Sequence, residues 1–333
     1  MESVRLGIVG IGWWGGVLTD AARASGLADV VACYARSAEA RTAFAEQRGC
    51  RAVDDLDDLL QDPQIEGVML ATPHSTHPDL VEQAVEAGKH VFVEKPLALT
   101  VDGVKRAARA ADRAGVVLQA GHNRRRQPAN RRIKSMIESG ELGAVLQLDG
   151  IHSGPGGFKP ELPQWRRDPQ ECPFGGMTGM GVHTVDTFHY LAGPAERVTA
   201  FSVRTQGFLP LDDATTVMIQ YERGPLGSIN TSYFAPPTVS LGVYGSDASA
   251  WNEEDGARLF TQARSEPARR ETEVEKLDTI ADELAEFARC IREGGQPETG
   301  AVEATEVAAV LEAIGRSFES GCAVNVAELR SPA

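Results

Sequence analysis

The first third of the chain alternates short apolar runs with amphipathic stretches. Apolar runs of strand length occur at residues 4–9, 30–34, 65–71, 90–93 and 116–119. Between them, apolar positions recur with helical spacing at residues 17–24, 38–47, 78–87 and 101–114. Buried strands separated by helices of this length are typical of a parallel sheet with helical crossovers. This part of the sequence therefore predicts an α/β fold with a Rossmann-type, doubly wound parallel sheet.

The pattern changes after a helical stretch at residues 128–139. A strand is predicted at residues 145–151, and a loop rich in glycine and proline follows at 153–176. Beyond the next helix, β-like runs follow one another without intervening helices, at residues 197–205, 215–221, 227–233 and 239–244. Turn residues separate these runs, which indicates an antiparallel sheet. Residues 264–275 predict an exposed charged connector, and two helices are expected at 279–292 and 301–320.

A chain of 333 residues is too long for a single small core. We expect a dinucleotide-binding domain at residues 1–122 and an α+β domain for substrate binding and oligomerisation at residues 123–333. The second domain should contain a large, mainly antiparallel open sheet. The last helix of the chain could pack back on the first domain.

A glycine-rich turn joins the first predicted strand to the first helix. It consists of Gly10, Ile11, Gly12, Trp13, Trp14 and Gly15. In this position glycines permit a tight turn and the close approach of backbone N–H groups to a pyrophosphate, next to the positive end of a helix. The turn therefore predicts a dinucleotide site.

The end of the second strand bears on the choice between NAD and NADP. An acidic residue there would bind the ribose 2′-hydroxyl and repel a 2′-phosphate. The sequence has no acid at this point but Arg36 and Ser37, which can pair with a phosphate and donate to it. We therefore predict a preference for NADP, with NAD also possible. Alternatively, Arg36 only covers the adenine, which would suit either cofactor.

Charge and cysteine content argue against several classes of protein. The formal net charge is −14, and an acidic surface repels nucleic acid. The basic run at residues 122–126 is interpreted as a solvated helix start or an ion-pair site. No apolar run is long enough to span a bilayer, no signal-peptide pattern is present, and the five cysteines have no metal-like spacing. We expect a cytoplasmic protein with no nucleic-acid partner, no membrane association and no metal.

Several ordered motifs give the chain a family resemblance. They are Ala71-Thr72-Pro73-His74-Ser75-Thr76-His77, Ala87-Gly88-Lys89-His90, Val91-Phe92-Val93-Glu94-Lys95-Pro96-Leu97, Gly121-His122-Asn123-Arg124-Arg125, Gly140-Glu141-Leu142-Gly143, Trp165-Arg166, Gly175-Gly176 and Gly181-Val182-His183. With the glycine turn, they resemble the Gfo/Idh/MocA oxidoreductase family, which includes glucose–fructose oxidoreductase and inositol dehydrogenase. The resemblance covers nearly the whole chain, most strongly residues 4–193. It implies an NAD(P)-dependent dehydrogenase or reductase that acts on CH–OH groups.

The resemblance also implies roles for individual residues. Lys95 would be the catalytic lysine and Glu94 its partner on the cofactor side. Lys95 follows a short strand, at the edge of the sheet where α/β folds bind ligands. The bond from Lys95 to Pro96 would be cis, as in relatives. Lys95 would also contact the cofactor, and the remaining cofactor-binding residues would be Thr72, Pro73, His74, His77, Pro96, Asn123, Trp165 and Arg166. Alternatively His74, which replaces a more usual asparagine, faces the substrate. The alternative for Trp165 and Arg166 is a solvated loop.

His183 is the candidate general acid or base. Oxidation of an alcohol releases a proton, and an imidazole can take it near neutral pH. Relatives carry an aspartate four residues before this histidine, whereas this chain has Gly179. Asp186 shares a helix face with His183 and could orient the ring, but bracing of the domain is the favoured interpretation. His189 extends an apparent H-x-x-D-x-x-H pattern, whose three-residue steps rotate off one helix face and suit a metal poorly.

The expected substrate is a small molecule, namely a sugar, polyol or cyclic diol with a secondary alcohol or ketone. Its expected contacts are Lys95, His122, Arg124, His183 and Tyr233. A homodimer or homotetramer is expected, because open sheets of this family often bury their outer faces. Two alternatives remain open: redox-assisted elimination with a tightly bound cofactor, and a regulator that senses a dinucleotide or sugar without catalysis.

Overall fold

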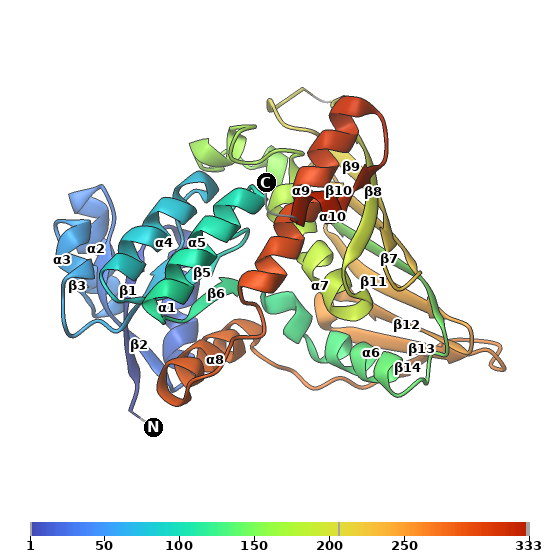
Figure 1. Ribbon diagram of the computed structural model, residues 1–333, viewed down its shortest axis with the longest axis horizontal. Helices are drawn as coiled ribbons and strands as arrows, with labels where there is room; N and C mark the ends of the chain where they lie inside the picture. The colour runs from blue at the N-terminus through green and yellow to red at the C-terminus, as the bar shows by residue number, and fades with distance from the viewer. Residues whose placement is uncertain (1, 206, 331–333) are drawn as a thin grey trace. The chain divides into compact units, whose positions relative to one another are not determined.

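The computed structural model describes residues 2–205 and 207–330 (Figure 1). The chain divides into two compact units. One contains the chain up to Asn123 together with Asp278–Thr305, and the other contains Arg124–Leu277 together with the chain from Glu306 onward. The domain boundary after residue 122 stays a prediction. The units show in addition that a segment from beyond residue 277 belongs with the first sheet.

The first unit is built on a six-stranded sheet in the order β3-β2-β1-β4-β5-β6. Its neighbouring strands pair in parallel. The strands are β1 Val4–Val9, β2 Ala28–Tyr34, β3 Arg51–Ala52, β4 Gly67–Leu70, β5 His90–Glu94 and β6 Leu118–Gly121. The strand order changes direction between β1 and β4, as it does in doubly wound folds. The predicted Rossmann-type sheet is confirmed.

Helices cover both faces of this sheet. They are α1 Trp13–Ala24, α2 Ala38–Arg48, α3 Leu56–Leu60, α4 His77–Glu86, α5 Val101–Ala114 and α8 Thr279–Glu293. Helix α8 packs against α1 and contributes Leu284 and Phe287 to the core around β1 and β2. On the other face, Leu59 of α3 lies against Gly7, where a β-carbon would come within 2.6 Å of the leucine. Helix α8 therefore completes a core that begins more than 250 residues earlier in the sequence.

The second unit contains a nine-stranded sheet in the order β14-β13-β12-β11-β7-β10-β9-β8-β15. Among the described strands of this sheet, only β7 and β10 pair in parallel, so the predicted mainly antiparallel sheet is confirmed. The strands are β7 Val145–Ser153, β8 Ala195–Val203, β9 Ala214–Tyr221, β10 Leu226–Ser232, β11 Thr238–Gly245, β12 Ala248–Glu253, β13 Arg258–Ala263, β14 Arg270–Thr272 and β15 Val324–Asn325. Strand β14 lies inside the stretch expected to be only a connector, so that prediction was wrong for residues 270–272.

The two faces of the second sheet differ in their covering. The helices of this unit are α6 Pro128–Glu138, α7 Val182–Ala192, α10 Val326–Arg330 and the part of α9 Ala301–Ser320 that begins at Glu306. Helix α7 lies so close to β7 that a β-carbon at Gly150 would meet Thr184 at 2.6 Å. On the opposite face Phe201, Met218 and Leu226 are 70%, 42% and 49% exposed. One face is therefore covered by helices, and the other presents apolar side chains.

We predict that Phe287→Ala lowers the free energy of unfolding by about 3–5 kcal/mol, because the substitution opens a cavity in the first core. Phe287 is fully buried, and its ring meets that of Phe92 edge-on at 5.9 Å. Urea denaturation would measure the change. The matched control is Val302→Ala, at a side chain that is 69% exposed. A change below about 1 kcal/mol for Phe287→Ala would contradict the assignment of α8 to this core.

Candidate active site

The glycine turn between β1 and α1 has the geometry of a dinucleotide cradle. Gly10 has a φ of +92°, and a β-carbon there would lie 2.5 Å from the carbonyl oxygen of Ala71. A β-carbon at Gly15 would lie 2.2 Å from the carbonyl oxygen of Gly10. A β-carbon at Gly12, by contrast, would meet nothing within 4 Å. Two of the glycines are needed by the fold, and the third leaves open the space that a pyrophosphate would need beside the N-terminus of α1.

The end of β2 carries exposed positive charge. Arg36 and Ser37 are both exposed, and the Ser37 hydroxyl accepts from the backbone N–H of Ala40 at the start of α2. Arg41, which the sequence analysis did not single out, donates to the carbonyl oxygen of Ala35 and to Asp54, both at a distance of 2.7–2.8 Å. Arg41 thereby ties Asp54 to the tip, and Glu39 is the acid in the first turn of α2. The preference for NADP stays a prediction.

The loop after β4 is held by a buried histidine. His77 is fully buried, and its two ring nitrogens lie 3.0 Å from the carbonyl oxygens of Pro96 and Thr72. The Thr72 and Thr76 hydroxyls are 2.8 Å apart, and His74 is also buried. His77 thus fixes the loop after β4 to the loop after β5. The cofactor-binding role of Thr72, Pro73, His74 and His77 stays a prediction.

The Lys95 turn lies at the carboxyl end of β5. Glu94 is 7% exposed, and its carboxylate accepts from the backbone N–H of Lys95 at 3.2 Å. The Lys95–Pro96 peptide bond is cis, as the resemblance implied. The Lys95 side chain is half-buried, and its catalytic role stays a prediction. Asn123 follows β6 and donates to the Thr279 hydroxyl at 2.9 Å, and His122 is fully buried.

In the second unit, a π-helical turn at Met177–Gly181 leads directly into α7. Such turns often occur at functional sites. His183 lies in the first turn of α7 and is 8% exposed. Three residues later, Asp186 is 1% exposed and accepts two hydrogen bonds from the Arg125 guanidinium, at 2.5 and 2.9 Å. These bonds tie α7 to the turn before α6, and the favoured role of Asp186 as a brace stays a prediction.

An arginine lies near Gly179, where the family resemblance led us to expect an aspartate. A β-carbon at Gly179 would lie 3.8 Å from a guanidinium nitrogen of Arg166. That guanidinium stacks over the ring of Trp165, at 4.4 Å from its centroid. Both residues belong to a short 3₁₀ turn, Gln164–Arg167. The surroundings of Gly179 are therefore cationic, and the contact of Trp165 and Arg166 with the cofactor stays a prediction.

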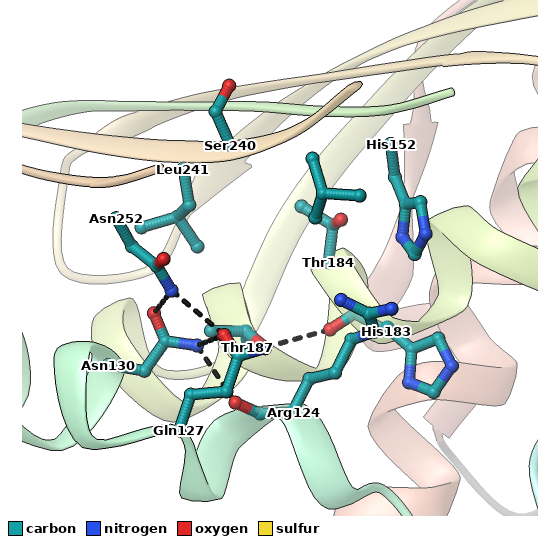
Figure 2. A pocket seen from close by; sticks show the side chains of 11 residues that line it. Arg124, Gln127, Asn130, His152, His183, Thr184, Thr187, Ser240, Leu241 and Asn252 are labelled. Carbon is teal, nitrogen blue, oxygen red and sulfur yellow. Dashed lines mark hydrogen bonds between the residues drawn. The ribbon is translucent and has the colours of Figure 1, made fainter. Parts of the chain in front are cut away.

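One partly open pocket lies between α6, α7 and the sheet of the second unit (Figure 2). Two residues that the sequence predicted for the substrate, Arg124 and His183, line it together with Gln127, Asn130, His152, Thr184, Thr187, Val239, Ser240, Leu241 and Asn252. Tyr233 does not line it but packs with Cys172, Leu209 and Leu211. Burial raises the pKa of the Tyr233 hydroxyl.

Charged and amide groups organise one wall of this pocket. Arg124 forms an ion pair with Asp255, and burial lowers the pKa of Arg124 to about 10, so the side chain stays cationic at neutral pH. Gln127 donates to Asp255, and Asn252 donates to Gln127 and Asn130 at 2.9 and 2.8 Å. The network ties the turn between β12 and β13 to α6. The wall is rigid and presents hydrogen-bonding groups.

His152 is a pocket residue that the sequence analysis missed. Its ring stacks beside that of His183, with a centroid separation of 6.0 Å and an interplanar angle of 29°. On β7, residues 148, 150 and 152 alternate inward toward α7. This period-two pattern was the signal that could have identified His152, but the predicted strand ended at residue 151.

The described residues also bear on metal binding and on membrane insertion. No group of three or more His, Cys, Asp or Glu side chains in residues 2–205 and 207–330 is arranged to hold a metal ion. No helix within the same ranges has the length and apolar content needed to cross a membrane.

Family models match both units. Residues 4–122 match an oxidoreductase family with an NAD-binding Rossmann fold. Residues 130–251 match the C-terminal domain of the Gfo/Idh/MocA family.

Individual relatives act on sugars and cyclic polyols. The chain is 28% identical to the 1,5-anhydro-D-fructose reductase of Ensifer adhaerens, over 83% of this chain and 84% of that protein. It is 28% identical to the scyllo-inositol 2-dehydrogenase (NAD(+)) of Bacillus subtilis (strain 168), over 82% of this chain and 81% of the relative. A similar solved structure, from Desulfitobacterium hafniense, is of a protein named as an NADPH-dependent oxidoreductase. The TM-score is 0.93 and the sequence identity is 27%, and the match covers 99% of this chain and 100% of that chain.

We predict that Asp186→Ala lowers the free energy of unfolding by about 3–5 kcal/mol, because the Arg125 charge remains buried without its partner. Replacing both residues, as in Arg125→Met with Asp186→Leu, should cost less than the sum of the two single changes. A double-mutant cycle by urea denaturation would measure both effects. The matched control is Glu141→Ala, which breaks the exposed pair with Arg132 at 2.8 Å and should change stability by less than about 1 kcal/mol. If Asp186→Ala and Glu141→Ala changed the free energy of unfolding equally, the role of Asp186 as a brace would be contradicted.

Proposed function

The chain belongs to the Gfo/Idh/MocA family of oxidoreductases, and we propose that it transfers hydride between NADP and a sugar, polyol or cyclic diol. The reacting group is a secondary alcohol or the corresponding ketone. The expectation of a nicotinamide-dependent dehydrogenase or reductase is confirmed at the level of the family. The preference for NADP and the class of substrate are the parts that we propose.

The lining of the His183 pocket is the observation that carries the choice of substrate. Its polar groups are hydroxyls, amides, imidazoles and one guanidinium, and its lining contains no aspartate or glutamate. Val239 and Leu241 add apolar surface. A molecule rich in hydroxyl groups can donate to the amide oxygens and accept from Arg124, while its C–H faces contact the apolar side chains. The substrates named for the relatives are of the same kind.

The cofactor-binding proposal rests on the first unit. The open space at Gly12, the N-terminus of α1 and the exposed Arg36 suit the pyrophosphate and a ribose 2′-phosphate. When bound, the nicotinamide supplies the hydride acceptor or donor. Named relatives differ in this respect, since one carries NAD(+) in its name and another NADPH.

Lys95 and His183 are proposed to act on the same hydroxyl. The Lys95 ammonium would donate a hydrogen bond to the substrate oxygen and so favour negative charge on it. The His183 imidazole would take the hydroxyl proton during oxidation and return it during reduction. Asp186 would contribute by orienting α7, through the two hydrogen bonds that it accepts from Arg125.

Two broader features belong to the same proposal. The apolar outer face of the second sheet, with Phe201, Met218 and Leu226 exposed, suits self-association into a homodimer or homotetramer. All five cysteines are thiols, which suits a cytoplasmic location.

Substitution of the two proposed catalytic residues tests the mechanism. We expect Lys95→Met and His183→Ala each to lower kcat by about 10²–10⁴-fold, the range typical of positioned acid–base groups. Binding of NADP, followed by tryptophan fluorescence, should stay within about threefold for His183→Ala. Lys276→Met is the matched control, because Lys276 is exposed in the connector before α8. Unchanged turnover for either variant would remove that residue from the mechanism.

Cofactor preference is tested at Arg36. Arg36→Ala should lower kcat/KM for NADP by roughly 10- to 100-fold, the usual effect of losing a hydrogen bond to a charged group. The kcat/KM for NAD should change little. Arg113→Ala, at an exposed arginine in the last turn of α5, is the control. A wild-type enzyme that clearly prefers NAD would overturn this part of the proposal.

A further inference from the structure

We propose that His152 and His183 work as a pair that shares one proton during turnover. In oxidation, the proton lost by the substrate hydroxyl moves to a ring nitrogen of His183. A proton then passes through one intervening hydroxyl group or water to His152 and from there to solvent. Reduction uses the same route in reverse. The inference rests on the proposed oxidoreductase function and extends it by one residue, which acts through His183 and so has a positioning role.

The position of His152 is set by the fold. Strand β7 turns residues 148, 150 and 152 toward α7, and Gly150 leaves room for Thr184 at the point of closest approach. The next inward residue along the strand is His152, which brings its ring beside the first turn of α7. His152 and His183 are 7% and 8% exposed and line the same pocket (Figure 2). Strand and helix therefore present two imidazoles to one small volume.

The separation of the rings suits a bridged transfer. Their centroids are 6.0 Å apart and their planes are inclined by 29°. Stacked rings at this distance cannot form a direct N–H···N hydrogen bond, but a single hydroxyl or water can span them with two hydrogen bonds of ordinary length. A substrate rich in hydroxyl groups could itself provide the bridge.

The other residues that line the pocket leave His152 and His183 as its proton-accepting groups. No residue that lines it is an aspartate or glutamate, so the imidazoles are the groups there that can take up a proton near neutral pH. The other charged group that lines the pocket is Arg124 from the turn before α6, and it is paired with Asp255. The next charges on α7 and before α6, Asp186 and Arg125, pair with one another. The residues that β7, β11 and β12 contribute to the lining add no further charge. A positive Arg124 and the nearness of the rings both oppose a second proton on the pair.

Activity measurements test the pair first. We expect His152→Ala to lower kcat for polyol oxidation by about tenfold or more, with the polyol KM changed by less than about threefold. Added imidazole should restore part of the lost rate. His152→Asn, which keeps hydrogen bonding but cannot take up a proton, should be as slow as His152→Ala. His189→Asn is the matched control, since His189 is a histidine on α7 that does not line the pocket. An unchanged kcat, or a rise in KM alone, would overturn the proposal.

A second measurement does not depend on turnover. The ring signals of His152 and His183, labelled with ¹⁵N and followed by NMR as pH is varied, report whether the two sites are coupled. Replacing His183 with Ala should move the titration midpoint of His152 upward by at least about half a unit, because a neighbouring positive charge is lost. If the titration midpoint of His152 did not change, the proposed coupling of His152 and His183 would be overturned, even if the enzyme is active. Failure of the wild type to turn over any polyol or ketone would instead refute the proposed function, and the NMR result would still decide the coupling.

Discussion

The buried pair of Arg125 and Asp186 is the interaction on which the rest of the site depends. Two opposite charges that are 2% and 1% exposed lie between the turn before α6 and the middle of α7. A buried charge without its partner is costly, so the pair strongly disfavours any rotation of α7 that separates them. His183 lies three residues before Asp186 on the same helix, and its direction is set by that constraint. The stacking of His183 with His152 then follows from the close contact of α7 with β7 at Gly150.

In the first unit, steric constraints fix the positions of the functional groups. At Gly10 and Gly15 a side chain would collide with backbone carbonyl oxygens, whereas Gly12 faces open space. His77 joins the loops after β4 and β5 through two carbonyl oxygens, so the Lys95 turn and the Thr72 loop are positioned together. Rigid groups at the carboxyl edge of a parallel sheet are what a dinucleotide-binding site requires. Each unit thus fixes its functional groups through a few buried contacts.

Much of this fold could be predicted from the sequence, because its strands and helices have strong and distinct periodicities. The parallel sheet, the antiparallel sheet and the glycine turn all follow from such patterns. Strands β12 and β13 were missed because their apolar residues do not alternate strictly: Trp251 follows Ala250, and Phe260 follows Leu259. Asn252 is also buried there by amide hydrogen bonds, which periodicity does not reveal. The packing of α8 in the first unit could not be predicted either, because the sequence of an amphipathic helix does not show which core the helix joins. His152 was missed because the predicted strand ended one residue before it, so the period-two pattern of inward residues was not extended to position 152.

The central claim is that this chain moves hydride between a nicotinamide and the carbon of a hydroxylated substrate. The most direct measurement uses NADPH carrying deuterium at both C4 positions of the nicotinamide, so that either face transfers label, and a panel of ketoses and keto derivatives of cyclic polyols. Mass spectrometry of the products would then locate the label. We predict one product alcohol with a single non-exchangeable deuterium on its carbinol carbon. Products without deuterium on carbon, or no reduction of any ketone in the panel, would contradict the account.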